Sequence, residues 1–325
     1  MRKVVTPSFG PLEQLQVVEG PNLEPGPGEV VIEVEAAGAN FVDALMCQGL
    51  YQVKPALPYT PGTEVAGRVG ALGDGVEGVE PGARVLALPH GGGYASQVVV
   101  PAAALVAVPE QLTAGQAAGL VQSYGTMLYA LTRRTTVTPN EWVVVLGAGG
   151  GIGLAAVDLA STMGARVVAC ASSAEKLALA EAAGAVATIN YEHEGVDLKA
   201  AIREVTGGGA HLVADPVGGQ RAESALRALR WGGRYLVVGF AAGEIPRFPL
   251  NQVLLNSRTL IGVEWGAWIG RFPEQNVVLM AELLDLVATG AIHPIEPEAR
   301  PLGDAVSLLH DLQARRVAGK VVLVP

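Results

Sequence analysis

Hydrophobic and polar positions follow two different patterns along the chain. In roughly the first 120 residues, short runs rich in Val and Ala, such as 29–38 and 62–73, lie between glycines and Pro-Gly pairs. Short apolar runs with frequent turn signals are typical of strands joined by tight turns. We therefore expect this part of the chain to form a compact β-rich unit, antiparallel or barrel-like.

From Trp142 onward, continuous apolar runs such as WVVVLG, RVVACAS and HLVADPV alternate with amphipathic stretches. Apolar runs without alternation are typical of parallel strands covered by helices on both faces. This half of the chain therefore predicts an α/β fold with a doubly wound parallel sheet, the Rossmann arrangement. Helices are expected at about 152–163, 174–183, 196–205, 220–230 and 302–312, with a closing strand after the last.

Composition argues against several function classes. The chain has 325 residues, half of them apolar, which is enough for two domains with buried cores. Its formal net charge of −9 and the lack of any Lys/Arg block argue against nucleic acid or an anionic membrane as a partner. No apolar run approaches the roughly 18 residues of a spanning helix, and the first residues lack the apolar core of a signal peptide. We expect a soluble cytoplasmic protein.

Only two cysteines, Cys47 and Cys170, are present, and they lie far apart. Two thiols cannot form a disulfide framework or a four-thiolate zinc site. We interpret both as small buried hydrophobic residues.

A glycine-rich turn, VVVLGAGGGIG, joins one apolar run to an amphipathic stretch. Ala148, Gly150 and Gly153 occupy the three small-residue positions of a dinucleotide fingerprint. Small residues there let the strand turn, let a pyrophosphate approach the backbone and let the helix pack on the strand, and the helix N-terminus favours the anion. An ordinary tight turn is the alternative, but the strand–turn–helix context favours a dinucleotide site. Its candidate residues are Ala148, Gly149, Gly150, Gly151, Ile152 and Gly153.

The choice between NAD and NADP is expected about 20 residues further on, where an acidic residue would bind the ribose 2′-hydroxyl of NAD. The chain has Ala171-Ser172-Ser173 there, with Lys176 one turn later. Hydroxyls and an ammonium suit a 2′-phosphate, so Ser172, Ser173 and Lys176 predict NADPH. Ser173 could instead cap the helix while Lys176 is solvated, and both roles are compatible. Glu175 weighs against the prediction because it could neutralise Lys176.

Several sequence blocks, in order, carry a resemblance to a known family. They include GANFVDALMCQGLY, LPYTPGTEVAGRV, GGYASQVVV, YGTMLYAL, GAGGGIGLAAV, ASSAEKLALAEAAGA, DPVGG and GKVVLVP. The chain resembles the medium-chain dehydrogenase/reductase superfamily, and within it the zinc-free quinone oxidoreductase branch, over nearly its whole length. The resemblance implies a GroES-like catalytic domain, residues 1–121 completed by 268–325, and a Rossmann NADP-binding domain, residues 122–267.

The resemblance also implies that no metal takes part. The zinc alcohol dehydrogenases of this superfamily place Cys and His where this chain has Asn40 and Thr63, and their cysteine-rich lobe is absent here. Zinc catalysis needs three protein ligands and an open position, which Asn and Thr do not supply. Without a Lewis acid, we expect acceptors that take up hydride readily, namely quinones or alkenes conjugated to a carbonyl.

By resemblance, Asn40, Asp43 and Tyr51 line the catalytic pocket. Asn40 would donate a hydrogen bond to the acceptor oxygen, and Tyr51 would bind substrate or close over the nicotinamide. The alternatives are that Asn40 caps a helix, that Asp43 is solvated and that Tyr51 packs in the core.

The resemblance implies further cofactor contacts, each with an ordinary structural role as its alternative. Thr126 would contact phosphate or nicotinamide, Tyr191 would lie at the adenosine phosphate end, and Lys320 would reach the pyrophosphate. Gly239, Phe240 and Ala241 follow a later strand, at the edge of the sheet where open α/β sheets bind ligands.

The leading hypothesis is an NADPH-dependent, zinc-independent reductase of quinones that acts as a homodimer. The segment Asn256–Trp268 is expected to be an edge strand ending in an aromatic loop. The family commonly pairs through this edge, although Trp265 and Trp268 could instead reach the substrate. An enoyl-thioester reductase with the same hydride chemistry is the first alternative, for which Lys54 is the only nearby cation. The second is a non-catalytic NADPH-binding protein, which would bind the cofactor without turnover.

Overall fold

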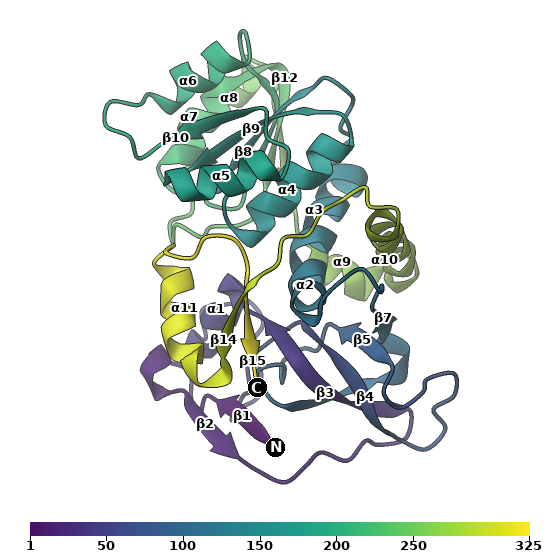
Figure 1. The fold of residues 1–325 in the computed structure, drawn as a ribbon. Coiled ribbons are helices and arrows are strands. Elements are labelled where there is room, and N and C mark those ends of the chain that lie inside the picture. The colour runs from purple at the N-terminus through teal and green to yellow at the C-terminus, as the bar shows by residue number, and fades with distance from the viewer. The chain divides into compact units, whose positions relative to one another are not determined.

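The computed structural model describes residues 1–325, which form two compact units (Figure 1). Unit 1 comprises residues 1–122 and 295–325, and unit 2 comprises residues 123–294. The chain therefore returns to unit 1 later than position 268, where the sequence-based boundary was set.

The segment 268–294 belongs to unit 2 because it is packed and bonded there. Most of it is the long helix α10 (Pro273–Ala288), which packs on α3 (Thr126–Tyr129) of the same unit. After this helix, the His293 N–H donates a hydrogen bond of 2.8 Å to the Asp158 carboxylate on helix α4 (Gly151–Thr162). This pairing corrects the expected second boundary.

Unit 1 is built around one sheet of mixed direction, with the order β14-β15-β3-β4-β5-β7 and with β6 also paired to β3. Only β14 and β15 are parallel, and the other pairs are antiparallel, as the short alternating runs predicted. The strands are β3 (Glu29–Gly38), β4 (Val65–Leu72), β5 (Arg84–Ala87), β6 (Gln97–Pro101), β7 (Val106–Ala107), β14 (Glu298–Pro301) and β15 (Val321–Val324). A separate ribbon pairs β1 (Arg2–Val5) with β2 (Gln16–Glu19).

The end of β3 brings the two ends of unit 1 together. β15 pairs antiparallel with β3, so that Val322 lies opposite Gly38. Helix α1 (Phe41–Gln48) begins directly after β3, and this arrangement makes neighbours of Asn40 and Lys320, which are 280 positions apart. The other helices of unit 1 are α2 (Ala114–Leu120) and α11 (Ala305–Gln313).

Unit 2 contains a six-stranded parallel sheet in the order β10-β9-β8-β11-β12-β13. Its strands are β8 (Trp142–Leu146), β9 (Arg166–Ala171), β10 (Ala187–Asn190), β11 (Ala210–Asp215), β12 (Leu229–Val237) and β13 (Thr259–Gly262). Read from β8, this is the doubly wound order in which the winding direction reverses between β8 and β11. The structure confirms the predicted Rossmann arrangement, and the central strands β8 and β11 are buried except at Trp142 and His211, as their apolar runs indicated.

Four helices of unit 2 lie where the sequence predicted them, whereas the long helix α10 was not predicted. The helices α4, α5 (Ala174–Ala182), α6 (Leu198–Val205) and α7 (Arg221–Ala228) begin and end within two residues of the ranges predicted. The aromatic segment expected to be a loop is instead helix α9 (Trp265–Arg271), because the Glu264 carboxylate accepts a hydrogen bond from the Ala267 N–H and caps a helix there. The remaining helices are α3 (Thr126–Tyr129) and α8 (Leu250–Leu254).

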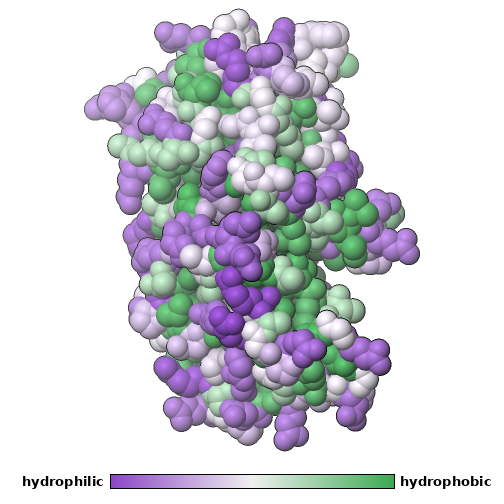
Figure 2. Space-filling model, turned by 45° about the vertical axis from the view of Figure 1, so that its right-hand side comes forward, coloured by the Kyte–Doolittle hydropathy of each residue, from purple (hydrophilic) through white to green (hydrophobic).

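Figure 2 shows hydrophilic and hydrophobic side chains intermingled on one face of the molecule. Among the exposed apolar side chains are Leu250, Leu254 and Leu255 of unit 2, each at least 70% exposed. None of the helices combines the length and the apolar character needed to cross a membrane.

Candidate functional site

Two glycines of the turn after β8 are required for steric reasons. Gly147 has φ of +61°, in the left-handed region, so the strand turns at Gly147 rather than at Ala148. A Cβ on Gly153 would lie within 3.0 Å of the backbone of both Gly147 and Ala148, so that only glycine lets α4 pack on the turn. The third small residue of the fingerprint therefore has the packing role that the sequence predicted.

Gly150 is a glycine for a different reason. Its φ of −103° is open to any residue, and a Cβ there would meet nothing closer than the Gly147 carbonyl oxygen at 3.7 Å. Gly150 is the N-cap residue of α4, a helix of 12 residues whose first N–H groups have no carbonyl partner within the helix. A glycine at this point keeps the helix N-terminus open, which suits a phosphate group held against the backbone.

The other cofactor residues predicted in unit 2 follow neighbouring strands of the same sheet. The residues that follow β9, β10 and β12 are Ser172, Ser173, Tyr191, Gly239, Phe240 and Ala241. Because the carboxyl ends of parallel strands share one edge of a sheet, these residues and the glycine turn lie at that edge, where open α/β sheets bind ligands. Thr126 is placed differently, at the start of helix α3, which packs on α4.

Close packing joins these loops to one another. The side chain of Lys176 lies so close to Gly149 that a Cβ at Gly149 would collide with it. In the same way, a Cβ at Gly218 would lie 3.0 Å from the Phe240 ring. The turn also meets the loop after β11, since a Cβ at Gly147 would lie 2.6 Å from Val217 Cγ2, so the glycine turn, the start of α5 and the loops after β11 and β12 form one continuous edge.

Ser173 and Lys176 have structural roles that are compatible with their predicted role in binding the 2′-phosphate. The Ser173 hydroxyl accepts a hydrogen bond of 3.3 Å from the Lys176 N–H, so Ser173 is the N-cap of α5. The capping alternative is therefore confirmed. The phosphate-binding role of both residues stays a prediction.

Two residues at this edge of unit 2 were not selected as candidates in the sequence analysis. Asp215 ends β11, and its Oδ1 accepts hydrogen bonds from the N–H groups of Val217 and Gly218 at 2.8 and 2.9 Å, while the Tyr235 hydroxyl donates to Oδ2 at 2.6 Å. Burial raises the pKa of Asp215, and these donors oppose that rise. An acid at the end of an apolar run was the signal that could have identified it.

Arg221 is the second such residue. Its guanidinium lies 4.2 Å from the centre of the Tyr191 ring and pairs with Glu192 at 2.6 Å. A cation therefore lies beside the tyrosine predicted at the adenosine phosphate end. Nothing in the local sequence pairs Arg221 with Tyr191, because the two are on successive βα units.

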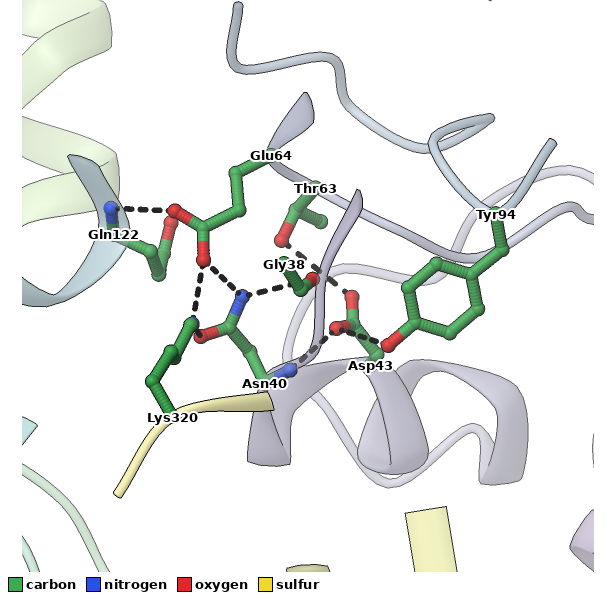
Figure 3. A network of polar contacts seen from close by, with 8 residues as sticks. All are labelled: Gly38, Asn40, Asp43, Thr63, Glu64, Tyr94, Gln122 and Lys320. Atoms are coloured by element: carbon green, nitrogen blue, oxygen red, sulfur yellow. Dashed lines mark hydrogen bonds and ion pairs between the residues drawn. The ribbon is translucent and has the colours of Figure 1, made fainter. Parts of the chain in front are cut away.

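Unit 1 holds a buried polar network at the start of α1 (Figure 3). The Lys320 ammonium donates to Asn40 Oδ1 at 2.7 Å and to Glu64 Oε1 at 2.6 Å. The Asn40 Nδ2 donates to the same Glu64 oxygen at 3.0 Å, and the Gln122 N–H donates to Glu64 Oε2 at 2.9 Å. The Glu64 and Lys320 side chains are only 2% and 8% exposed, so this is an ion pair largely removed from solvent.

Asp43 is buried beneath this network rather than solvated. It has no exposed surface, and its Oδ2 accepts hydrogen bonds of 2.9 Å from both the Asn40 N–H and the Tyr94 hydroxyl. The Thr63 hydroxyl lies 3.5 Å from the other oxygen. Burial raises the pKa of Asp43 to about 6, although the hydrogen bonds and the Lys320 charge lower it in part. By accepting from the N–H of the N-cap residue Asn40, Asp43 holds the start of α1, and its predicted place in the catalytic pocket stays a prediction.

The structure thus brings Asn40, Asp43 and Lys320 into one network, together with two residues that the sequence analysis did not select, Glu64 and Tyr94. Glu64 had a visible signal, since it is a charged residue at the start of the apolar run EVAGRVG. Tyr51, the third predicted catalytic residue, lies half-buried in the bend after α1, between the exposed side chains of Leu50 and Val53.

The structure also shows what surrounds the two tryptophans and the two cysteines considered in the sequence. Trp265 is buried, with its ring against Gly125, and its Nε1 donates to Asn276 at 3.2 Å. Trp268 packs against Tyr129, with ring centres 4.9 Å apart. Both tryptophans therefore stabilise unit 2. Both cysteines are buried, as expected. No group of three or more His, Cys, Asp or Glu side chains is placed to hold a metal ion.

Two family models match the chain. A model described as alcohol dehydrogenase GroES-like domain matches residues 26–110, and a model described as zinc-binding dehydrogenase matches residues 151–282. A quinone oxidoreductase-like protein 2 homolog of Nematostella vectensis is 42% identical over 197 residues, which are 60% of this chain and 53% of that protein. The chain thus spans about half the length of the curated relatives it matches.

Solved structures match over the whole chain. A probable oxidoreductase of Mycobacterium abscessus is 36% identical, with a TM-score of 0.86 and coverage of 100% of this chain and 99% of the other. The quinone oxidoreductase of Escherichia coli, solved in complex with NADPH, is 30% identical, with a TM-score of 0.90 and full coverage of both chains. The chain therefore belongs to the medium-chain dehydrogenase/reductase superfamily. Within the superfamily, these relatives assign it to the quinone oxidoreductase branch, as the sequence blocks predicted.

Proposed function

We propose that this protein is an NADPH-dependent reductase of quinones that works without zinc. The observation that carries the proposal is Gly150, a glycine that neither backbone conformation nor packing requires, at the N-terminus of a helix open to a phosphate. The Escherichia coli relative was solved with NADPH, which supports the cofactor, and the relatives named quinone oxidoreductases support the acceptor.

In this proposal, unit 2 binds the cofactor and unit 1 polarises the acceptor. The bound cofactor supplies a hydride, and the quinone takes up that hydride and one proton to become a hydroquinone. Negative charge develops on the quinone oxygen as the hydride arrives, so a preorganised donor there lowers the barrier. We assign this donor to the Asn40 amide, with Tyr51 as a second group that binds the substrate.

The first experiment is an acceptor panel. NADPH oxidation is followed with ortho- and para-quinones and with short enoyl thioesters, and NADH is run in parallel. Turnover of quinones with NADPH supports the proposal. A clear preference for enoyl thioesters would replace the acceptor and keep the cofactor, whereas tight NADPH binding without turnover on any acceptor would leave a binding protein.

The preference for NADPH over NADH is assigned to Ser172, Ser173 and Lys176. Replacing the ammonium in Lys176→Met removes a charge-assisted bond to the 2′-phosphate and is expected to weaken NADPH binding about tenfold while leaving NADH binding unchanged. Lys199→Met, an exposed lysine on α6, is the matched control. Equal losses for NADPH and NADH would contradict the assignment.

We further propose that two copies pair through β13. This strand forms one edge of the sheet, and an open edge beside exposed apolar side chains favours pairing with a second strand. Leu254 and Leu255, just before β13, are 78% and 71% exposed. Leu254→Glu/Leu255→Glu is expected to convert a dimer into a monomer in light scattering, while the control Val277→Glu/Val278→Glu on α10 leaves the mass unchanged. A wild-type monomer would contradict the pairing.

A further inference from the structure

We propose that Glu64 and Lys320 are positioning residues that set the orientation of the Asn40 amide for hydrogen-bond donation to the acceptor oxygen. The inference rests on the proposed function, in which Asn40 is that donor. It gives Lys320 a role different from the pyrophosphate contact that the family resemblance implied.

The three side chains form a closed ring of polar contacts (Figure 3). Lys320 Nζ donates to Asn40 Oδ1, Asn40 Nδ2 donates to Glu64 Oε1, and the ring closes because Lys320 Nζ also donates to that Glu64 oxygen. All three distances lie between 2.6 and 3.0 Å, within the normal range for strong polar contacts.

This ring selects one of the two orientations of the amide. In the observed orientation, the Asn40 oxygen faces an ammonium and its NH2 group faces a carboxylate. A flip of the amide would place the NH2 hydrogens against the ammonium, and the amide oxygen against the carboxylate. Both new contacts would be repulsive, and in a site with little solvent neither is screened.

One Asn40 hydrogen is left for a substrate. The NH2 group has two hydrogens, of which one is held by Glu64 at 3.0 Å. The other has the Gly38 carbonyl at 3.5 Å, the outer limit of a hydrogen bond, so little is lost when it donates elsewhere. The ring therefore presents one weakly engaged N–H in a fixed direction, which is what stabilisation of a developing charge requires.

Two glycines make room for the charged pair. A Cβ on Gly38 would collide with the Glu64 carboxyl, and a Cβ on Gly119 would lie 2.9 Å from Lys320 Cγ. Glu64 is also fixed by the Gln122 N–H. A buried ion pair is usually replaceable by apolar side chains without loss of stability, so stability alone does not account for a pair built in this way. Orientation of the amide does account for it.

The test compares Glu64→Leu/Lys320→Met with Asn40→Leu and with the triple variant. Removing both charges together avoids an unpaired buried charge, so the double variant is expected to fold. It should lower kcat with quinones about tenfold and leave the NADPH Kd within about twofold. In the Asn40→Leu background, the same two substitutions should change kcat less than about twofold, because they act through Asn40.

A second readout does not depend on turnover. The Asn40 side-chain amide signals are identified in nitrogen-15 NMR spectra by their loss in Asn40→Leu, and their hydrogen exchange is measured. Exchange should become about tenfold faster in the double variant, because the ring no longer holds the amide. Unchanged exchange would overturn the positioning role.

The outcomes separate this inference from the proposed function. A wild-type protein without quinone turnover overturns the function, and amide exchange then still decides whether the pair holds Asn40. An NADPH Kd raised tenfold or more in the double variant, with kcat unchanged, would overturn the inference and return Lys320 to the cofactor. Additive effects on kcat would also overturn it.

Discussion

The glycine turn of unit 2 and the polar network of unit 1 are built in opposite ways. The turn is made of backbone, from consecutive residues between Gly147 and Gly153, and its shape follows from missing side chains. The network is made of side chains from Asn40, Glu64 and Lys320, which lie far apart in the sequence. A site made of backbone has no room for an added side-chain atom, whereas a site made of buried charges is destabilised by a charge that lacks its partner.

The largest expected effect comes from removing one charge of the buried Glu64–Lys320 pair. Lys320→Met alone leaves the Glu64 carboxylate buried without its cation and is expected to lower the free energy of unfolding by about 3–5 kcal/mol. Glu64→Leu/Lys320→Met should stay within about 1 kcal/mol of wild type, since no charge is left unpaired. Urea unfolding measures both. Equal losses in the single and double variants would show that packing, not charge, matters here.

The next-largest effect is expected from a substitution that adds one carbon atom to the turn. Gly153→Ala places a Cβ against the backbone of Gly147 and Ala148 and is expected to cost about 3 kcal/mol of unfolding free energy. Gly270→Ala in α9, where a Cβ meets no atom within 4 Å, is the control and should be neutral or slightly stabilising. A thermal melt showing the same midpoint for both variants would mean that α4 can shift away from the turn.

The buried carboxyl of unit 1 predicts a pH dependence that the turn lacks. Because burial raises the pKa of Asp43 from its ordinary value of 3.8 to about 6, the folded protein binds a proton more tightly there than the unfolded chain does. The stability from this proton is present in full below pH about 4 and is lost as pH rises through 6, by up to about 3 kcal/mol.

Asp43→Asn tests this dependence with little change of shape. An amide oxygen can accept the bonds from Asn40 and Tyr94, and its NH2 can donate to Thr63. The variant is expected to lose the Asp43 part of the fall in stability between pH 4 and 7, measured by urea unfolding across that range. Identical pH profiles for variant and wild type would place the pKa of Asp43 near its ordinary value.

The smallest effect on stability is expected at Gly150, in the same turn as Gly153. Gly150→Ala is expected to leave the free energy of unfolding within about 0.5 kcal/mol of wild type, because nothing in the protein occupies the space. It should weaken NADPH binding about tenfold, because the methyl group keeps the pyrophosphate from the backbone. Calorimetric titration measures the Kd. Unchanged affinity would mean that Gly150 has no part in binding.

Much of unit 2 could be predicted because its signals are local. The Val-rich strands, the helices between them and the small residues from Ala148 to Gly153 are each readable within a short window. Errors occurred where a distant or side-chain contact decided the outcome. Glu264 caps a helix where a loop was expected, and Asp158 binds the segment that was assigned to unit 1.

The sequence by itself determined the two kinds of hydrophobic pattern, the doubly wound sheet and the place of the glycine turn, because periodicity and steric need are written in consecutive residues. Only the tertiary structure decided that Lys320 pairs with Glu64 and that both hold Asn40. Strand pairing between β3 and β15 creates that neighbourhood, and no local pattern records which of 22 lysines and arginines will meet which of 31 acidic residues. Burial makes this pairing necessary, because a charge removed from water is costly unless it has a partner inside the protein.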